Sequence, residues 1–508
     1  MDPSHATLKA RVTATIAGPL GNETGRSVAP FIDGLLSRSE GDATLDVINP
    51  SNGEHLLTIP AGCDADVDRA VTSARRAFEA GGWSDAPPSF RKRTLYRFAE
   101  LIEGDASSLD ALDAAEMGKP VGEAAFNAAG AAALMRFYAE AIDKIRGDVL
   151  ASDKNSLVTH RRVPRGVVAA VVPWNFPTFN AALKIAPALA AGNCAVLKPS
   201  ELSSRSAIRF AHLAMQAGLP PGVLNVVPGR GETVGRALAV HGDVDMVAFT
   251  GSTEVGKRML QYSGESNMKV VIAECGGKSP QIVFGDGVDV EAAGDMIARM
   301  LLVNQGQVCS VGSRLLVQRS VEEAVLEKVV ARVKQIVIGD ALDPGTTFGP
   351  LVSKKQEARV MQFIESAEAQ GARLLTGGRR TLTKSGGYFV EPTVFTGVSP
   401  RAKIAQQEIF GPVLSVIPFD DEADAIRIAN DTIYGLAAYV WTANLSTGMR
   451  MAKGIRSSVL VNATVPQGEG PGFGASLEPA QQSGVGTEGG IAGLESYTRK
   501  QLVWFNHA

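Results

Sequence analysis

The alternation of short apolar runs with helical patterns between residues 167 and 273 constrains the fold more than any other feature of this sequence. The run Val167–Val172 is almost continuously apolar, which is typical of a strand covered on both faces. Residues 180–191 then have a helical pattern, and Gly192–Asn193 is a good stop signal. Strands that alternate with helices predict parallel βαβ units and a doubly wound α/β sheet. The further predicted strands are 194–197, 223–227, 246–249 and 269–273, and the further helices are 204–217, 232–240 and 253–262.

Small, polar and charged residues follow the predicted strands, where ligands bind in doubly wound sheets. The turn at Thr250–Ser252 leads into a helix N-terminus, where free N–H groups and the helix dipole favour a phosphate. The segment Gly229–Gly235 resembles a dinucleotide glycine fingerprint, but its last gap is one residue too long. An ordinary strand-to-helix turn explains that segment about equally well. Two such turns in adjacent units nevertheless favour a nucleotide site.

The loop 304–314 contains a single cysteine, Cys309. A free cysteine is usually a small buried hydrophobe. Its neighbours Gln305, Gln307 and Ser310 do not form the pattern of a core strand. The loop therefore makes Cys309 a candidate nucleophile, whose reactive form would be the thiolate.

Composition excludes several other classes of protein. A chain of 508 residues is long enough for about three domains at ~150 residues each. The formal net charge of −3 gives no reason to expect a nucleic acid or an anionic membrane surface as a partner. The 4 cysteines form no CxxC pair, which fits a reducing compartment and no zinc site, and the 6 histidines show no metal-binding spacing. No stretch reaches the ~18 apolar residues that span a bilayer, so we expect a cytoplasmic protein with a loose N-terminal extension over residues 1–25.

The ordered set of motifs resembles the NAD(P)-dependent aldehyde dehydrogenase superfamily from about residue 46 to residue 498. The matching segments are PWNFP at 173, LKPSE at 197, FTGST at 249, ECGGKSP at 274, NQGQVC at 304, QEIFGPV at 407 and QSGVG at 482. The resemblance implies the aldehyde dehydrogenase fold, in which a Rossmann-like cofactor domain joins an α/β catalytic domain and a small β oligomerisation element.

The resemblance also implies where these units lie and how copies assemble. The NAD-binding domain is expected at 26–146 and 166–275, and the catalytic domain with the nucleophilic cysteine at 276–480. The oligomerisation element is expected at 147–165 and 485–508, in a homodimer or homotetramer. Residues 156–162 alternate loosely, which is consistent with an exposed pairing strand.

The implied reaction is oxidation of an aldehyde to a carboxylic acid through a thiohemiacetal and a thioester on Cys309. Asn175 matches the side-chain donor to the oxyanion, with the backbone N–H of Cys309 as the second donor. Glu274 matches the base that activates water, and it favours release of a free acid over transfer to coenzyme A. Lys184 matches a lysine near the nucleophile, although a solvated helix lysine is almost as compatible. We expect a lowered pKa for the Cys309 thiol.

The cofactor is expected to be NAD, and no metal is expected. Lys198 and Glu201 match the pair that holds the adenosine ribose, and a carboxylate at 201 would repel the 2′-phosphate of NADP. Further residues that match cofactor contacts are Trp174, Gly231, Thr250, Gly251, Ser252, Val255, Glu408 and Phe410; for Phe410, a place in the core is equally compatible. The substrate is a small-molecule aldehyde, and the expected pocket walls are Phe176, Phe179, Leu183, Val308 and Ser310.

Two departures from the family pattern affect the expected site. Cys275 replaces the usual leucine, which places a second thiol near the site and raises the hypothesis of a redox pair with Cys309. The segment 463–482 is altered and longer than usual, so the substrate entrance is the least transferable part. A cysteine hydrolase would need a histidine near Cys309, and none lies in the flanking motifs. A catalytically silent member is disfavoured by the intact Cys309, Glu274 and Asn175.

Overall fold

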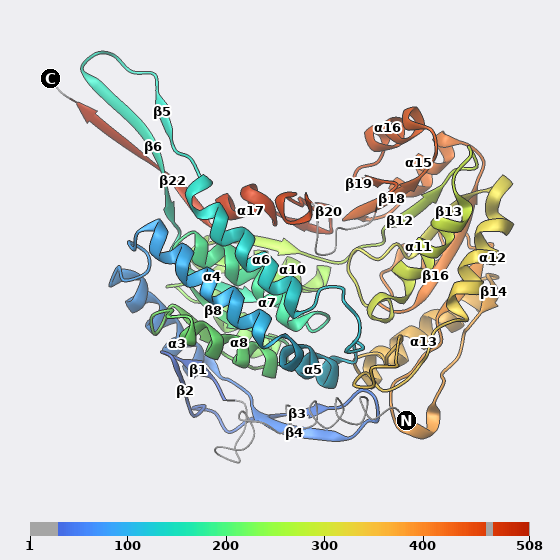
Figure 1. Ribbon diagram of the computed structural model, residues 1–508, viewed down its shortest axis with the longest axis horizontal. Helices are drawn as coiled ribbons and strands as arrows, with labels where there is room; N and C mark the ends of the chain where they lie inside the picture. Colours follow the sequence, from blue (N-terminus) through green and yellow to red (C-terminus); the bar gives the residue numbers. More distant parts are fainter. Residues whose placement is uncertain (1–28, 464–470, 507–508) are drawn as a thin grey trace.

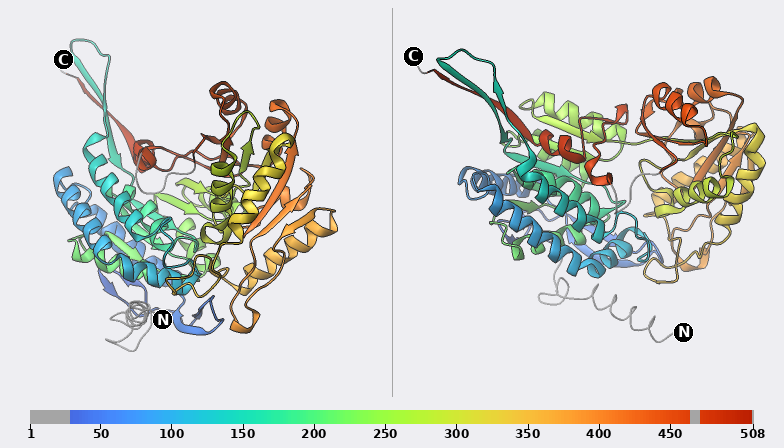
Figure 2. Two further views of the ribbon diagram at one scale, coloured as in Figure 1. Left: turned by 45° about the vertical axis from the view of Figure 1, so that its right-hand side comes forward. Right: turned by 45° about the horizontal axis from the view of Figure 1, so that its top comes forward.

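The computed structural model describes residues 29–463 and 471–506. Two α/β lobes lie next to each other, and a slender β arm projects from the first (Figures 1 and 2). This architecture confirms the predicted fold class: a doubly wound sheet, a second α/β unit and a small separate β element. The predicted extension at residues 1–25 lies outside the described residues.

The first lobe is built on a sheet to which the described residues contribute eight strands, in the order β2-β1-β9-β8-β7-β10-β11-β21. Its parallel strands are almost entirely buried, which explains their continuous apolar sequence. These parallel strands are β7 (Val167–Val171), β8 (Cys194–Lys198), β9 (Leu224–Val226), β10 (Met246–Thr250) and β11 (Val270–Glu274). The antiparallel edge strands are β1 (Phe31–Ile32), β2 (Leu35–Leu36) and β21 (Gly484–Val485).

The crossover helices of this sheet follow the sequence prediction with one exception. Helix α7 (Pro177–Ala190) begins at a proline, which is favoured in the first helical turn because its missing N–H would have no partner there. The predicted helix 232–240 is instead divided into a π-helical turn (Gly231–Gly235) and the short α9 (Arg236–Val240). The other crossover helices are α8 (Arg205–Gln216) and α10 (Thr253–Glu265).

A layer of N-terminal helices packs beside α7 and α8. Helix α6 packs on both α4 and α7, and α5 contacts α6, α7 and α8. The helices of this layer are α4 (Pro88–Gly104), α5 (Ala106–Met117) and α6 (Ala128–Ala141). Helix α3 (Asp64–Glu79), which follows the hairpin of β3 (Thr44–Ile48) and β4 (His55–Pro60), instead packs on β7, β8 and β9. Buried alanines at 128, 131, 132 and 139 allow α6 to approach its neighbours closely.

The second lobe has its own sheet, with strand order β14-β15-β16-β13-β12-β18-β19. All pairs are parallel except β14 with β15. The strands are β12 (Pro280–Val283), β13 (Arg314–Gln318), β14 (Arg373–Thr376), β15 (Thr393–Thr396), β16 (Val413–Phe419), β18 (Ala437–Trp441) and β19 (Ser458–Val461). The helices are α11 (Val290–Leu302), α12 (Glu322–Val333), α13 (Lys354–Ala369), α14 (Lys403–Gln406), α15 (Glu422–Asn430) and α16 (Leu445–Gly454).

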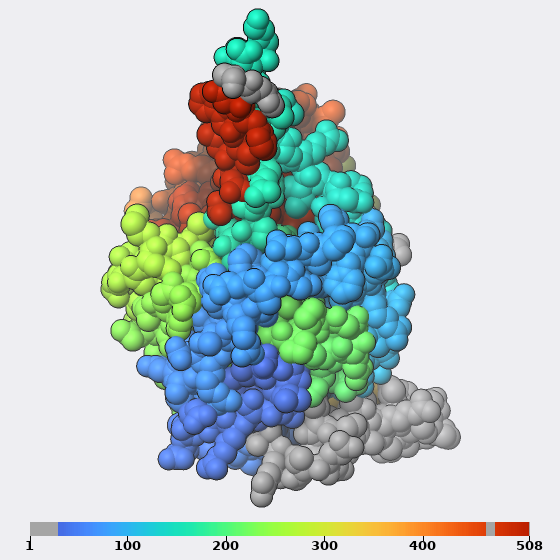
Figure 3. Space-filling model, turned by 90° about the vertical axis from the view of Figure 1, so that its left-hand side faces the viewer, coloured from blue at the N-terminus to red at the C-terminus, as the bar shows by residue number. Residues whose placement is uncertain are grey.

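The projecting arm is a three-stranded antiparallel sheet of β5 (Asp148–Leu150), β6 (Ser156–Pro164) and β22 (Thr498–Asn506). Strands β6 and β22 pair along their whole length, and the short helix α17 (Gly490–Ser496) leads into β22. The space-filling view shows the arm standing clear of the first lobe (Figure 3).

The two sheets are joined where β11 ends at Glu274 and β12 begins at Pro280. The chain therefore passes from the carboxyl edge of the first sheet directly into the amino edge of the second. The cysteine loop precedes β13 and lies at the same amino edge. Among the helices that the structure describes, none combines the length and apolarity needed to cross a bilayer.

Candidate active site

The topology of the first sheet predicts a ligand crevice at the carboxyl edge of its strands. The chain runs outward from β7 through β8 to β9 and then returns to β10 on the other side of β7. Strand order therefore reverses between β7 and β10, and doubly wound sheets bind ligands at such a reversal. The segments that leave these strands are Pro173–Phe176 and Gly251–Ser252, and both contain predicted site residues.

The loop that carries Cys309 is held in an unusual backbone conformation. Asn304, Gln305 and Gly306 have φ angles of 45°, 56° and 70°, all in the left-handed region. The buried side chain of Gln307 fixes this turn, since its Nε2 donates to the Asn304 carbonyl at 3.1 Å and its Oε1 accepts from the Val352 N–H at 3.0 Å. The buried glutamines that made a core strand improbable are therefore the framework of the loop.

Asn175 is fixed directly against this loop. Its Nδ2 donates to the carbonyl of Gln307 at 3.0 Å, two residues before Cys309, and its Oδ1 accepts from Asn180 Nδ2 at 3.3 Å. The Asn304 side chain donates to the Asn175 carbonyl at 2.8 Å. One N–H of the Asn175 amide is not used in these bonds, so it is available to an oxyanion formed at Cys309.

Two glycines allow the nucleophile and Glu408 to approach the junction between the sheets. A Cβ on Gly277 would lie 2.4 Å from the Cys309 carbonyl oxygen, and a Cβ on Gly276 would lie 2.4 Å from Glu408 Oε2. The N–H of Gly277 donates to Glu408 Oε1 at 3.0 Å. A side chain at Gly277 would therefore push the Cys309 backbone away, whereas one at Gly276 would displace the carboxylate of Glu408.

The expected lowering of the Cys309 pKa is wrong for the free chain. Burial, together with the carboxylates of Glu408 and Glu274, raises the pKa of the thiol to about 12. The backbone N–H groups of Ser310 and Cys309 act in the opposite direction but do not compensate. The sequence-based expectation counted N–H donors and did not place two carboxylates beside the sulfur.

Glu274 ends β11 in a buried environment, and its Oε1 has no hydrogen-bond partner among the described residues. Burial raises its pKa well above the usual value, and nearby Glu488 raises it further, whereas Lys184 lowers it. A carboxyl group with a raised pKa can accept a proton near neutral pH. The environment of Glu274 therefore suits a general base.

Lys184 is buried, and the alternative of a solvated helix lysine is excluded. Its Nζ forms an ion pair with Oε1 of Glu488. Glu488 was missed by sequence reasoning because it lies far along the chain in a glycine-rich segment with no recognisable motif. The hydroxyls of Tyr138 and Tyr497 lie buried in the same region, and burial, with a smaller contribution from Glu488, raises the pKa of both.

The predicted cofactor residues collect along the carboxyl edge of the first sheet. Lys198 donates to Oε2 of Glu201 at 3.3 Å, so the two residues predicted to hold the ribose lie together. Ser252 caps α10 by accepting from the Val255 N–H at 3.3 Å, which leaves a helix N-terminus aimed at the crevice. The buried Thr250 hydroxyl has no partner among the described residues. These donors fit a dinucleotide: vicinal hydroxyls at the first pair and a pyrophosphate at the helix N-terminus.

An aromatic pair marks the other end of this cofactor region. The rings of Trp174 and Phe410 meet edge to face with centroids 5.3 Å apart, although they come from different lobes. Phe410 is only half-buried and has φ 60°, so it is not an ordinary core residue. Glu408 lies two residues before it, beside Gly276 and Gly277. Gly231 begins the π-helical turn, and no atoms would contact a Cβ there.

The expected substrate walls form part of an aromatic cluster. Phe176 and Phe179 are nearly buried, and the half-buried ring of Phe126 lies 4.6 Å and 5.1 Å from them by centroid. Phe126 was missed because it lies between helices and matches no motif. The remaining predicted walls flank this cluster or Cys309: Leu183 on α7, and Val308 and Ser310 on either side of the nucleophile. In the altered segment 463–482, residues 464–470 lie outside the described residues.

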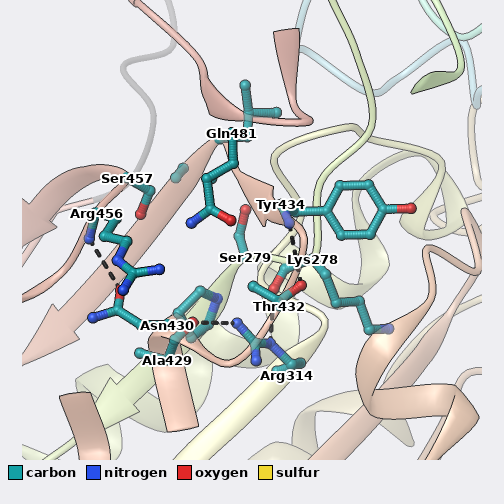
Figure 4. Close-up of a pocket in the computed structure, with 14 residues that line it drawn as sticks. Lys278, Ser279, Arg314, Ala429, Asn430, Thr432, Tyr434, Arg456, Ser457 and Gln481 are labelled. Atoms are coloured by element: carbon teal, nitrogen blue, oxygen red, sulfur yellow. Dashed lines mark hydrogen bonds between the residues drawn. The ribbon is translucent and has the colours of Figure 1, made fainter. Parts of the chain in front are cut away.

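A small pocket begins next to Gly277, at Lys278, and lies in the second lobe (Figure 4). Its central group is the buried guanidinium of Arg314, which donates to the carbonyls of Lys278, Ile428 and Ala429 at 2.8, 3.1 and 2.9 Å. Arg314 thus ties the segment that follows the glycine pair to the helix α15. Its role is structural, because it supports the backbone on which Gly277 and Cys309 meet.

Cys275 points into the first lobe. A Cβ on Gly256 of α10 would lie 2.4 Å from its sulfur, so the thiol packs against the start of that helix. Burial raises the pKa of Cys275 to about 12, so its thiolate is disfavoured. The hypothesis of a redox pair with Cys309 receives no support from this packing and stays a prediction.

The comparisons with known proteins agree with this geometry. A model of the aldehyde dehydrogenase family matches residues 37–503. The NADP/NAD-dependent aldehyde dehydrogenase PuuC of Escherichia coli is 42% identical over 484 residues, which is 94% of this chain and 95% of that protein. Aminoacetaldehyde dehydrogenase of Pseudomonas aeruginosa is 41% identical over 480 residues, covering 94% and 95% of the two chains. The chain belongs to the aldehyde dehydrogenase family.

Solved structures support the same class. An indole-3-acetaldehyde dehydrogenase solved with NAD+ has 45% sequence identity and a TM-score of 0.93, with 99% of both chains covered. The family confirms the predicted enzyme class, an NAD-dependent aldehyde dehydrogenase. The solved indole-3-acetaldehyde dehydrogenase contains the predicted cofactor. The substrates in the names of these relatives differ, so they do not define one for this chain.

The charge around Cys309 leads to a prediction about its reactivity. Glu408→Gln removes the larger of the two carboxylate effects, so it is expected to lower the Cys309 pKa and raise the thiolate fraction at pH 8. Iodoacetamide should then alkylate Cys309 several-fold faster, as measured by peptide mass spectrometry. Glu365→Gln, which neutralises an exposed carboxylate on α13, should leave the rate unchanged. An unchanged or lower rate in Glu408→Gln would contradict the assigned cause of the raised pKa.

Proposed function

We propose that this protein oxidises an aldehyde to the free carboxylic acid with NAD, through covalent intermediates on Cys309. The observation that carries the proposal is the convergence of Asn175, Cys309 and Glu274 where the two sheets meet. An aldehyde carbon is electrophilic, a thiolate can add to it, and the oxygen then gains negative charge. Asn175 and the Cys309 N–H are the donors available to that oxygen.

The nucleophile must lose its proton before it attacks. Because burial and two carboxylates favour the neutral thiol, its proton passes to water before the attack. The C–S bond forms as the carbonyl π electrons move to oxygen, which gives the thiohemiacetal. When bound, NAD supplies the acceptor for the hydride that leaves the former aldehyde carbon and makes the thioester.

Hydrolysis completes the cycle. Glu274 takes a proton from water, the resulting nucleophile adds to the thioester carbonyl, and the C–S bond breaks to release the acid and regenerate Cys309. The ion pair of Lys184 with Glu488 lies beside Glu274 and modulates its charge. We assign Lys184 to control of that charge and not to direct attack.

The cofactor choice rests on Glu201. Its carboxylate, paired with Lys198, can accept from two ribose hydroxyls but would repel a 2′-phosphate. We therefore propose NAD over NADP, although PuuC is described as using both. Trp174, Phe410 and Glu408 would hold the nicotinamide end close to Cys309.

The substrate is proposed to be an aldehyde with an apolar group. The rings of Phe126, Phe176 and Phe179 meet next to Asn175 and offer aromatic surface at that end of the site. An aromatic face favours flat or aliphatic groups over charged ones.

Self-assembly is proposed to use the β arm, with a homodimer or homotetramer as the result and the cytoplasm as the location. The arm exposes large apolar side chains, including Trp504 at 67% exposure, Phe505 and Leu502. Exposed apolar clusters of this kind mark protein interfaces. The domain limits expected from the sequence stay a proposal that is consistent with the separate sheets of the two lobes and of the arm.

The primary test is NADH formation by purified protein with short aliphatic, long aliphatic, aromatic and amino- or hydroxy-aldehydes. Cys309→Ser is expected to lose at least ~10⁴-fold in turnover because the covalent path is removed. Cys63→Ser, a change at a cysteine far from the site, should retain activity within about two-fold. Replacing NAD with NADP should reduce kcat/KM. Comparable NADH formation by Cys309→Ser would sink the proposal.

Glu274→Gln separates oxidation from hydrolysis. It should release a burst of about one NADH per active site and then turn over ~10²–10⁴-fold more slowly. Because the pKa of Glu274 is raised, its basic form and the wild-type hydrolysis rate should increase with pH through that pKa, and the variant should lose this limb. Hydroxylamine, a nucleophile that needs less activation than water, should restore turnover. Loss of the burst together with the steady state would instead place Glu274 before the thioester.

The arm prediction concerns assembly. Trp504→Asp should shift the protein to a smaller species in sedimentation velocity, because a charge at the interface costs association energy. Leu445→Asp changes an apolar residue on α16 that is 76% exposed and lies away from the arm, so it should leave the sedimentation coefficient unchanged. An identical profile for Trp504→Asp and the wild type would exclude the arm as the interface.

A further inference from the structure

Helix α5 carries three carboxylates at a spacing of three residues: Asp110, Asp113 and Glu116. On an α-helix this spacing places side chains on one face, with a gradual rotation. That face is turned towards the helices α6, α7 and α8, which all contact α5. Asp113 and Glu116 are buried, and Asp110 is partly buried.

Each carboxylate accepts from a backbone N–H in the first turn of a different helix. Asp110 Oδ1 accepts from the N–H of Ala128, the first residue of α6, at 2.9 Å. Asp113 Oδ2 accepts from the N–H of Thr178, the second residue of α7, at 3.1 Å. One helix thereby caps the N-termini of its neighbours from outside their own sequence.

Glu116 makes the corresponding contact with α8. Its Oε2 accepts from the N–H of Arg205, the first residue of α8, at 3.3 Å. Its Oε1 accepts from the guanidinium Nε of the same arginine at 2.6 Å. The carboxylate therefore caps the helix and also forms a buried ion pair with its first side chain.

The helices α7 and α8 need hydrogen-bond acceptors from outside their own sequence. Their own N-cap residues, Phe176 and Ser204, make no side-chain capping bond. The first turn of any helix leaves N–H groups without intrahelical partners, and these groups are costly when buried. Asp113 and Glu116 satisfy one such group each, so the positions of α7 and α8 are coupled to α5.

Asp113 is buried, and burying a carboxyl group costs folding free energy unless hydrogen bonds compensate for the lost water. Burial raises the pKa of Asp113 to about 7, although the bond from the Thr178 N–H and the neighbouring hydroxyls of Ser206 and Thr178 act to lower it. The other groups that face it are Asp110, which also raises the Asp113 pKa, and Lys119, whose ammonium donates to the carbonyls of Glu123 and Ala125.

The two capped helices begin directly after the two most important loops of the site. Helix α7 follows Pro173–Phe176, and its first turn also supplies Asn180, whose amide donates to Asn175 Oδ1 at 3.3 Å. Helix α8 follows the segment that contains Lys198 and Glu201. A shift of α7 would therefore move both the backbone and the side-chain partner of Asn175.

We propose that Asp113 is a positioning residue for the reaction: by fixing the first turn of α7 it holds Asn175 where the oxyanion forms. Glu116 has the matching role for the ribose pair on the loop before α8. The inference rests on the proposed function, because it needs Asn175 to serve as the oxyanion donor.

The test compares Asp113 and Glu116 variants in two assays, aldehyde oxidation with NAD and hydrolysis of p-nitrophenyl acetate without cofactor. Both reactions build an oxyanion at Cys309. Asp113→Ala should lower kcat about 10-fold or more in both assays. This loss is smaller than the ~10²–10³-fold loss expected when an oxyanion donor is removed completely. In the oxidation assay, the KM for NAD should stay within about two-fold of the wild-type value. Asp113→Asn keeps an oxygen acceptor and should restore most of the activity. Glu116→Gln should instead raise the KM for NAD and leave ester hydrolysis nearly unchanged.

The matched control is Asp421→Ala, which removes the carboxylate that caps α15 in the second lobe through the Asp424 N–H at 2.9 Å. It should leave both assays unchanged. Where Asp113→Ala does not fold, Asp113→Ser replaces it, because a serine hydroxyl keeps the site polar but is too short to reach Thr178.

Two results would overturn the proposal: a folded Asp113→Ala or Asp113→Ser protein within two-fold of wild type in both assays, or an Asp113→Asn protein as impaired as the alanine variant. Failure of the proposed function is recognised separately, because Cys309→Ser would then still oxidise aldehydes. If Cys309→Ser is inactive and Asp113→Ala is normal, only the positioning role is lost.

Discussion

The site depends on the close approach of two backbones at the junction of the sheets. Gly277 lies so near the Cys309 carbonyl that any side chain would separate them, and Gly276 leaves the same space for Glu408. The left-handed turn at 304–306 and the bond from Asn175 to Gln307 both fix the cysteine loop in this contact. Arg314 holds the segment that follows Gly277 by donating to the carbonyl oxygens of Lys278, Ile428 and Ala429. Neither lobe alone contains a complete set of reacting groups.

Electrostatics at the junction favour neutral groups before substrate arrives. Three carboxyl groups, Glu274, Glu408 and Glu488, lie near the thiol or near one another, while Lys184 is the cation paired among them. Burial raises the pKa values of Glu274, Glu408 and Cys309, and neighbouring carboxylates add to this effect at Glu274 and Cys309. The carboxyl groups of such a site lose their protons when a positive charge or a reacting group enters and lowers their pKa values. The same carboxyl groups in water would already be ionised at neutral pH.

The sequence was sufficient for features that local patterns encode. Alternating apolar runs predicted the buried parallel strands, and the motif order predicted the loops at 173, 250, 274 and 304 that meet in the crevice. Contacts between distant segments could not be predicted in this way: Glu488 reaches Lys184 and Phe126 reaches Phe179 only after the chain has folded. The Cys309 pKa was predicted in the wrong direction for the same reason, since local N–H donors are visible in sequence and facing carboxylates are not. The helix broken at 231–235 shows the limit of periodicity, because a π-helical turn has nearly the same apolar pattern.

The arm places a constraint on the order in which the chain can be completed. Strand β6 is synthesised more than 300 residues before its long partner β22, which consists of residues 498–506. While translation continues, β6 presents an unpaired edge, and such edges recruit other strands. A chain made through residue 506 can close this edge itself, whereas a chain that stops before residue 498 cannot. The arm therefore distinguishes chains that contain β22 from shorter ones before any interface that depends on the arm can form.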